Sequence, residues 1–257
     1  MDTYQQSRET EAFLDALQGI SPQTVSACDG WTAHEVTAHL AAGAAEVTRH
    51  LDPYLEGRAV PRTRGFEERE PFYRAMEDHR LRSQLAVEEE RMRRAIGEVL
   101  NREPEAVIPW TGRHMAVSAF IPHMRNEFAV HRWDVTGDDA LGDELLGQLD
   151  LTVHAVRVLG PLLLARGRAH DPAAGEDFRV RLRASGAPDV RVIVESGRAC
   201  VELGGDGEEG EEESGVELSQ AARVLVLWGR RPGRREQFRS DLPSADLARL
   251  QALLSGY

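Results

Sequence analysis

The sequence contains no lysine, so every basic side chain other than histidine is an arginine. The 43 acidic residues outnumber the 31 basic ones, and the formal net charge is −12. Nucleic acids and anionic membranes both require a basic surface, so this balance argues against either as a partner. An arginine-only composition also indicates a GC-rich coding bias.

Leader sequences, long apolar runs and paired cysteines are lacking as well. The first residues, MDTYQQSRETEAF, contain no basic segment followed by an apolar one, as a signal peptide would. No apolar run approaches the ~20 residues of a membrane-spanning helix. The two cysteines, Cys28 and Cys200, form no CxxC motif, which excludes a zinc finger or a disulfide framework. We therefore expect a cytoplasmic protein with two reduced thiols, acting as a monomer or homodimer.

What the sequence does contain, over its first two thirds, is helical periodicity. Thr32 and Glu35 have the spacing of a capping box, which predicts a helix that begins there. Gly137 is typical of a helix end. The pattern predicts helices over 9–18, from 32 onward, and over 68–100, 118–136 and 143–166, with loops at 53–65 and 101–112.

After residue 170 the pattern changes to apolar residues that alternate with charged ones, as in half-buried strands. The segments concerned are 177–184, 189–195, 198–203 and 216–218. A helix is expected after Ser219 and another over 241–255, whereas the acidic run 204–215 is expected to be a solvated loop. The fold class predicted is α+β: a helical bundle over residues 1–168, followed by a small α+β domain over 176–257.

Three ionisable residues lie on apolar faces of the predicted bundle. His131 continues an apolar stripe of the helix 118–136, and Glu127 lies four residues before it on the same side. His39 takes the same kind of position on the helix that begins at Thr32. Two imidazoles and one carboxylate form a complete ligand set for a catalytic metal with an open position. Asp134 could orient one of these ligands through a hydrogen bond.

The segments WTxxEVxAHLAxG (31–43), RNEFAVHRWDV (125–135) and VELSQAARVLVLWGR (216–230) together resemble the mycothiol-dependent maleylpyruvate isomerase family. The resemblance implies a DinB-like four-helix bundle that holds a divalent metal, typically zinc, and a C-terminal α+β domain. It also implies mycothiol as the thiol cosubstrate. Because actinobacteria use this thiol, the resemblance implies an actinobacterial source, which the arginine-only composition fits. Carried over to this sequence, the metal ligands are His39, Glu127 and His131.

The resemblance further implies a catalytic arginine in the C-terminal domain, for which Arg230 is the best match and Arg231 its neighbour. His123 and Arg125, near the start of the helix with two ligands, are candidates for cofactor binding. A thiol at the open metal position would be deprotonated, and the thiolate could attack an electrophilic small molecule. Both cis–trans isomerisation and S-transfer follow from that chemistry.

Two alternatives remain from the residues themselves. A metal-dependent hydrolase would use the same trio with water in place of thiol. A non-catalytic zinc-binding regulatory protein would keep the bundle for binding alone. Proteins of the latter kind usually place a cysteine beside their histidines. Cys28 lies eleven residues before His39 and ahead of the expected helix, so we expect no cysteine near the histidines.

Overall fold

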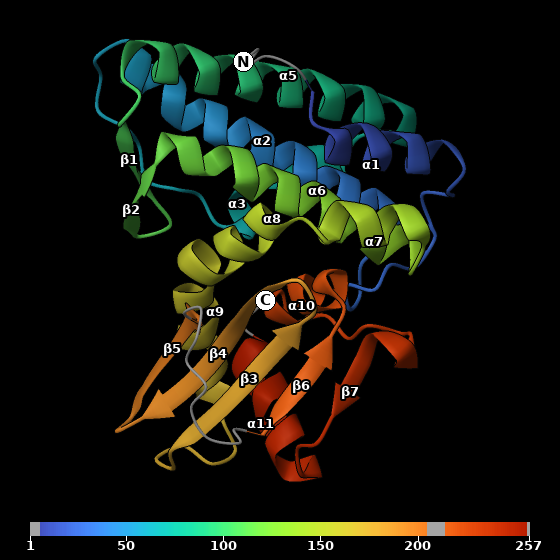
Figure 1. Ribbon diagram of the computed structural model, residues 1–257. Coiled ribbons are helices and arrows are strands. Elements are labelled where there is room, and N and C mark those ends of the chain that lie inside the picture. The colour runs from blue at the N-terminus through green and yellow to red at the C-terminus, as the bar shows by residue number, and fades with distance from the viewer. Residues whose placement is uncertain (1–5, 205–213, 256–257) are drawn as a thin grey trace. The chain divides into compact units, whose positions relative to one another are not determined.

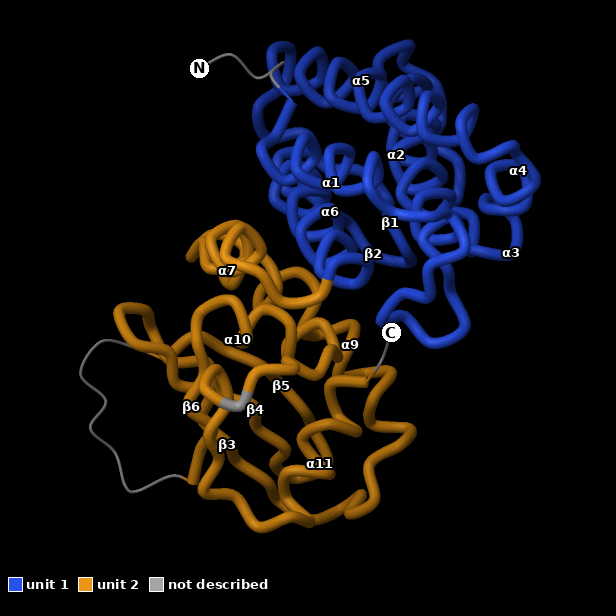
Figure 2. Tube along the Cα trace, turned by 90° about the vertical axis from the view of Figure 1, so that its right-hand side faces the viewer, with its two compact units in different colours: residues 1–136 blue, residues 137–257 orange. Residues whose placement is uncertain are grey.

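The computed structural model describes residues 6–204 and 214–255 and forms two compact units, residues 1–136 and 137–257 (Figures 1 and 2). The first unit is helical, and the second combines helices with a sheet. The predicted α+β class, with a helical N-terminal domain and a small α+β domain, is confirmed. The acidic run predicted as a loop falls mostly within residues 205–213, which lie outside the described residues.

The helical unit is built on four helices of 11 to 25 residues, with two single-turn helices and one hairpin between them. Its elements are α1 (Arg8–Gln18), α2 (Ala33–Leu55), α3 (Phe66–Arg69), α4 (Pro71–Arg74), α5 (Asp78–Arg102), β1 (Val107–Trp110), β2 (Arg113–Ala116), a 3₁₀ turn (Val117–Ala119) and α6 (Phe120–Thr136). Helix α2 packs along α5 and α1 along α6 (Figure 1). The Phe13 and Phe128 rings meet edge to face at 5.8 Å in the core.

Local sequence signals explain where the main helices begin and end. The Thr32 side chain accepts from the Glu35 amide, and the Glu35 carboxylate accepts from the Thr32 amide, so α2 begins with the predicted capping box. Helix α6 is followed by Gly137, whose φ of 75° few other residues adopt readily. Both signals place the start of α2 and the end of α6 where the sequence predicts them.

Two predicted elements of this unit are wrong. The single helix over 68–100 is instead divided into α3, α4 and α5, because Pro71 cannot continue a preceding helix and begins α4. The loop over 101–112 contains the end of α5, strand β1 and the turn of a β1–β2 hairpin. Thr111 and Gly112 form that turn with positive φ values of 49° and 79°, a backbone that suits a two-residue hairpin connection.

The second unit packs helices on a five-stranded sheet. Its elements are α7 (Ala140–Leu146), α8 (Leu149–His154), a π-helical turn (Ala155–Leu159), α9 (Gly160–Gly167), a 3₁₀ turn (Arg168–His170), β3 (Phe178–Ala184), β4 (Ala187–Glu195), β5 (Arg198–Leu203), β6 (Gly215–Leu218), α10 (Gln220–Leu227), a 3₁₀ turn (Arg235–Gln237), β7 (Phe238–Ser240) and α11 (Ser244–Leu254). The strand order is β5-β4-β3-β6-β7. Strands β3 and β6 run parallel, and the other neighbours are antiparallel.

Strand β3 has the predicted alternation of buried apolar and more exposed charged residues. Phe178, Val180, Leu182 and Ala184 of β3 are buried, while the arginines between them are more exposed. Helix α10 contacts β3 and β6, and α9 contacts β5, so helices cover the apolar face of the sheet (Figure 1).

The structure divides the chain earlier than the sequence suggested. The boundary lies between residues 136 and 137, not within 168–176, because α7, α8 and α9 pack with α10, α11 and the sheet. The predicted helix over 143–166 is also interrupted, since α7 ends at Gly147 and α8 begins at Leu149. In the described residues, no single helix is long and apolar enough to cross a membrane; only the pair 140–146 and 149–170, bent by 56°, passes that test together.

Candidate metal centre

The three predicted metal ligands converge inside the helical unit. His39 comes from α2, and Glu127 and His131 come from successive turns of α6. The Nε2 atoms of His39 and His131 lie 3.5 Å and 3.4 Å from the same Glu127 oxygen, Oε2. All three residues are buried, each with a relative exposure of 5% or less. One ligand atom from each residue lies within 4.8 Å of the other two, which is close enough for one metal ion.

A carboxylate holds the outer nitrogen of each imidazole. His39 Nδ1 lies 2.7 Å from Glu70 Oε1, and His131 Nδ1 lies 2.8 Å from Asp134 Oδ2. In the neutral tautomer that donates from Nδ1, the Nε2 lone pair of each ring faces Glu127. This carboxylate–histidine arrangement is the one that orients histidine ligands in metal sites. The residues therefore fit a divalent metal that prefers nitrogen and oxygen ligands, such as zinc.

The charges at this centre are coupled. Burial opposes the charge of Glu127, but hydrogen bonds from His131 and His39 hold the pKa of that carboxyl well below its usual range. Burial likewise opposes a charged His131, yet its contacts with Asp134, Cys28 and Glu127 raise the pKa of that imidazole. The centre thus stabilises an ionised carboxylate and positive charge beside it. A divalent cation among these three side chains would supply that positive charge in place of protons.

Aromatic side chains enclose the two imidazoles. The Trp31 ring stacks on His131 with 6.5 Å between centroids and contacts the His39 ring at 5.1 Å. Phe66 meets His39 edge-on at 5.1 Å. The Arg74 guanidinium lies over Trp31 and also donates to Glu70 Oε2, at 3.0 Å and 2.8 Å. Apolar walls of this kind limit water access and strengthen electrostatic interactions within the site.

Residues 4–136 match the sequence profile of the family described as the mycothiol maleylpyruvate isomerase N-terminal domain. The chain belongs to this family. No curated protein matches it.

Solved structures agree with this assignment at the level of the fold. Two are similar over 91% of this chain and 90% of theirs, each with a TM-score of 0.65 and 16% identity. They are crystal structures of the mycothiol-dependent maleylpyruvate isomerase and of a histidine-to-alanine mutant of it. At this identity the likeness establishes a shared fold across both units.

The structure brings two more predicted residues to the trio. Asp134 contacts His131 as described above, in the orienting position predicted for it. His123 Nε2 lies 3.6 Å from Glu127 Oε1, on the other oxygen of the carboxylate. Burial lowers the pKa of His123, which favours its neutral form. A cofactor-binding role for His123 stays a prediction.

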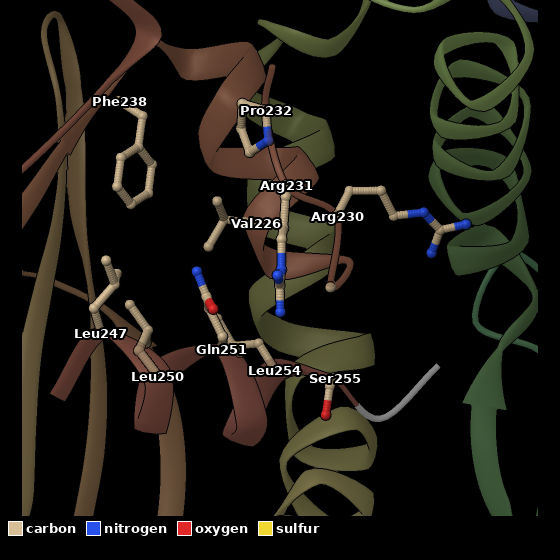
Figure 3. Close-up of a pocket in the computed structure, with 11 residues that line it drawn as sticks. Val226, Arg230, Arg231, Pro232, Phe238, Leu247, Leu250, Gln251, Leu254 and Ser255 are labelled. Atoms are coloured by element: carbon tan, nitrogen blue, oxygen red, sulfur yellow. The ribbon is translucent and has the colours of Figure 1, made fainter. Parts of the chain in front are cut away.

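Other predicted residues lie elsewhere. Arg125 donates from Nε and Nη2 to the buried Glu9 of α1, at 3.1 Å and 2.9 Å, so it links α6 to α1. In the second unit, Arg230 and Arg231 both line a pocket between α10 and α11, whose empty volume is about 640 Å³ including its opening to solvent. The Arg231 side chain extends towards Gln251, whereas the Arg230 side chain extends to the other side (Figure 3). The cofactor-binding role of Arg125 and the catalytic roles of Arg230 and Arg231 stay predictions.

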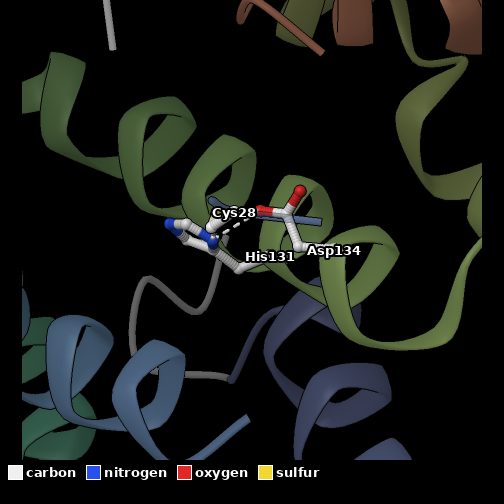
Figure 4. A group of neighbouring side chains, drawn as sticks. All are labelled: Cys28, His131 and Asp134. Carbon is white, nitrogen blue, oxygen red and sulfur yellow. Dashed lines mark hydrogen bonds and ion pairs between the residues drawn. The ribbon is translucent and has the colours of Figure 1, made fainter. Parts of the chain in front are cut away.

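One expectation about this site is wrong. Cys28 lies beside one of the histidines, His131: its sulfur donates to Asp134 Oδ2 at 3.1 Å and is 3.9 Å from His131 Nδ1 (Figure 4). The loop before α2 folds against the end of α6, where the Ala27 amide donates to the Asp134 carbonyl at 2.7 Å. Cys28, His131 and Asp134 thus form a second group whose donor atoms lie close together. Spacing along the chain gives no signal for such a contact between distant segments.

Proposed function

We propose that the protein is a metal- and mycothiol-dependent enzyme that acts on an electrophilic small molecule, by cis–trans isomerisation or S-transfer. Family membership and the convergence of two Nε2 atoms on one buried carboxylate support this proposal. The second observation carries most weight, because each Nδ1 is engaged by its own carboxylate and each lone pair is thereby directed inward. We also propose that the enzyme works in the cytoplasm, where low-molecular-weight thiols are kept reduced.

His39, Glu127 and His131 would hold the metal, for which zinc is our proposal. When bound, a divalent cation lowers the pKa of a thiol and so supplies the thiolate nucleophile. Glu70 and Asp134 keep the two imidazoles in the tautomer and orientation that binding requires. Trp31 and Phe66 pack on the rings and keep bulk water away from them. His123 stands at the second Glu127 oxygen, where it can hold a proton.

The first test is metal content together with thiol dependence. We expect about one equivalent of metal in the wild type by plasma mass spectrometry. His39→Ala removes a ligand itself. It should therefore weaken zinc binding by more than the ~10–100-fold that follows from loss of a residue that only hydrogen-bonds a ligand. His34→Ala is the control, since His34 lies on the same helix and pairs with Asp78 outside the trio. Isomerisation of a cis-unsaturated keto acid without net loss of thiol, or S-transfer that consumes the thiol, should require both mycothiol and an intact trio.

Three results would contradict the proposal. Full activity in a metal-free His39→Ala variant would remove the metal from the reaction. Hydrolysis that needs metal but no thiol would favour the hydrolase alternative. Stoichiometric metal without thiol binding, measured by calorimetry, would favour a binding protein.

A further inference from the structure

A small cavity adjoins the trio on the side of His123. It is lined by two of the proposed ligands, His39 and Glu127, together with Arg69, Trp110 and His123. Its empty volume is about 280 Å³, including its opening to solvent. Because this volume includes open solvent, the enclosed part of the cavity has room for one small polar group, such as a carboxylate.

Arg69 is the unusual residue in this cavity. It ends helix α3, and its guanidinium lies over the Phe66 ring with 4.8 Å between Cζ and the ring centroid. Its Nε atom is buried and has no hydrogen-bond partner in the part of the chain that the structure describes. Within that same part, no acidic side chain forms an ion pair with Arg69. A buried donor without a partner costs free energy that a ligand can recover.

The arginines around α3 and α4 behave differently. Arg62 pairs with Glu68, Arg64 with Glu46, and Arg74 with Glu70. Glu68 and Glu70, the acids on either side of Arg69 in the sequence, therefore already have other partners. A positive charge in the wall of a cavity, beside two metal ligands, is the arrangement expected of a group that binds an anion.

Electrostatics on the cavity wall favour an anion near Arg69. The charges of Arg113 and Arg69 both act on the His123 ring, so both arginines lie close to it. Glu127 opposes this field from the other side of the cavity, where its Oε1 lies near His123 and its Oε2 faces the imidazoles of the trio. An anionic group entering the cavity is therefore attracted to its arginine side.

We propose that Arg69 binds the carboxylate of the electrophilic substrate and so selects for small acids. The proposal rests on the proposed function, because it places the substrate at the trio. The guanidinium face is covered by Phe66, which leaves its edge to donate two parallel hydrogen bonds from Nε and a terminal nitrogen. A planar carboxylate matches that edge. A thiolate offers a single acceptor atom and would gain less from it.

The test measures binding of maleate to the zinc-loaded protein by calorimetry and by fluorescence, since Trp110 lines the cavity. We expect Arg69→Met to raise the maleate Kd at least ~10-fold, as loss of a bidentate charged pair does. Arg69→Lys should fall in between, because it keeps the charge and loses the planar donor pair. Zinc affinity and melting temperature should stay close to wild type. Arg94→Met, which removes an exposed charge paired with Glu90, is the control and should leave maleate binding unchanged.

The anion at Arg69 could come from the acid or from the thiol. Dimethyl maleate, which lacks the carboxylates of maleate, and 2-mercaptoethanol, a simple thiol, distinguish these two sources. If Arg69 binds the acid, Arg69→Met weakens maleate alone. If the variant weakens the thiol and leaves maleate unaffected, the assignment is overturned. Equal maleate affinity in wild type and Arg69→Met, or no maleate binding to the wild type, also overturns it. If the wild type binds no metal, the proposed function is refuted instead. The role of Arg69 would then be tested by comparing maleate binding to the metal-free wild type and to metal-free Arg69→Met.

Discussion

Glu70 offers the sharpest test of how the metal centre is built. Its Oε1 lies 2.7 Å from His39 Nδ1, and its Oε2 accepts from Arg74, while the side chain is only 2% exposed. Burial opposes its charge, yet these contacts lower the pKa of the carboxyl. Glu70→Ala would remove the acceptor that fixes the His39 tautomer, with no change to any of the three proposed ligands.

The size of the effect follows from this geometry. Loss of such an outer partner typically weakens metal binding ~10–100-fold. This corresponds to about 1.4–2.7 kcal/mol. Glu70→Gln keeps an acceptor oxygen and loses the charge, so we expect its effect at the lower end of that range. Competitive titration against a chromophoric zinc chelator measures the Kd directly. The zinc-dependent rise in melting temperature should shrink in the same order.

A matched control separates this effect from general destabilisation. Glu89 is also 2% exposed and pairs with an arginine four residues later, Arg93, but it lies on α5 away from the trio. Glu89→Ala should lower the melting temperature and leave the zinc Kd within about threefold of wild type. A Glu70→Ala variant that binds zinc as tightly as wild type would refute the assigned role of Glu70. If both variants bind zinc equally weakly, the loss of affinity reflects general destabilisation and not the contact between Glu70 and His39.

Two further predictions concern stability. Burial opposes ionisation of Glu46, but hydrogen bonds from Arg49 and Arg64 hold its pKa at about 2, so its contribution is complete above pH 4.5 and is lost as pH falls towards 2. Glu46→Gln should therefore cost up to ~3 kcal/mol at pH 7 and progressively less in acid, measured by urea denaturation. Gly167→Ala should destabilise by ~1–3 kcal/mol despite the helix propensity of alanine, because its Cβ would lie 2.0 Å from a backbone oxygen of α11. Gly43→Ala, in open space on α2, should not lower the melting temperature.

The sequence located the trio because helical periodicity fixes which side chains share a face. Glu127 and His131 are one turn apart on α6, so their proximity is a local property. His39 was found by its place on an apolar stripe of α2 and by the family resemblance. Asp134 followed from the same reasoning, since it lies three residues after His131. Each of these residues belongs to a long helix that the sequence predicts, and the start of α2 and the end of α6 lie where expected.

Residues outside regular helices were missed for the opposite reason. Arg69 ends the single-turn helix α3 and Glu70 lies between α3 and α4, where no periodicity relates a side chain to a distant face. Cys28 reaches Asp134 only because its loop folds back on α6, a contact between segments far apart in the chain. The hairpin was missed because Pro109 suggested a loop, although the Thr111–Gly112 turn is compatible with paired strands. Tertiary packing determines such contacts, and the periodicity of a single sequence does not predict them.

The balance of charge around the trio relates the metal site to the proposed role of Arg69. Glu70, Glu127 and Asp134 are three buried carboxylates, and Arg74 offsets one of them. With both histidines neutral, a divalent cation would balance the remaining two, so the centre would carry no net charge. Arg69 is then in excess at the cavity wall, and an anionic ligand is what would neutralise it. By this reasoning small acids should bind more tightly when the metal is present, because the Glu127 charge no longer repels them.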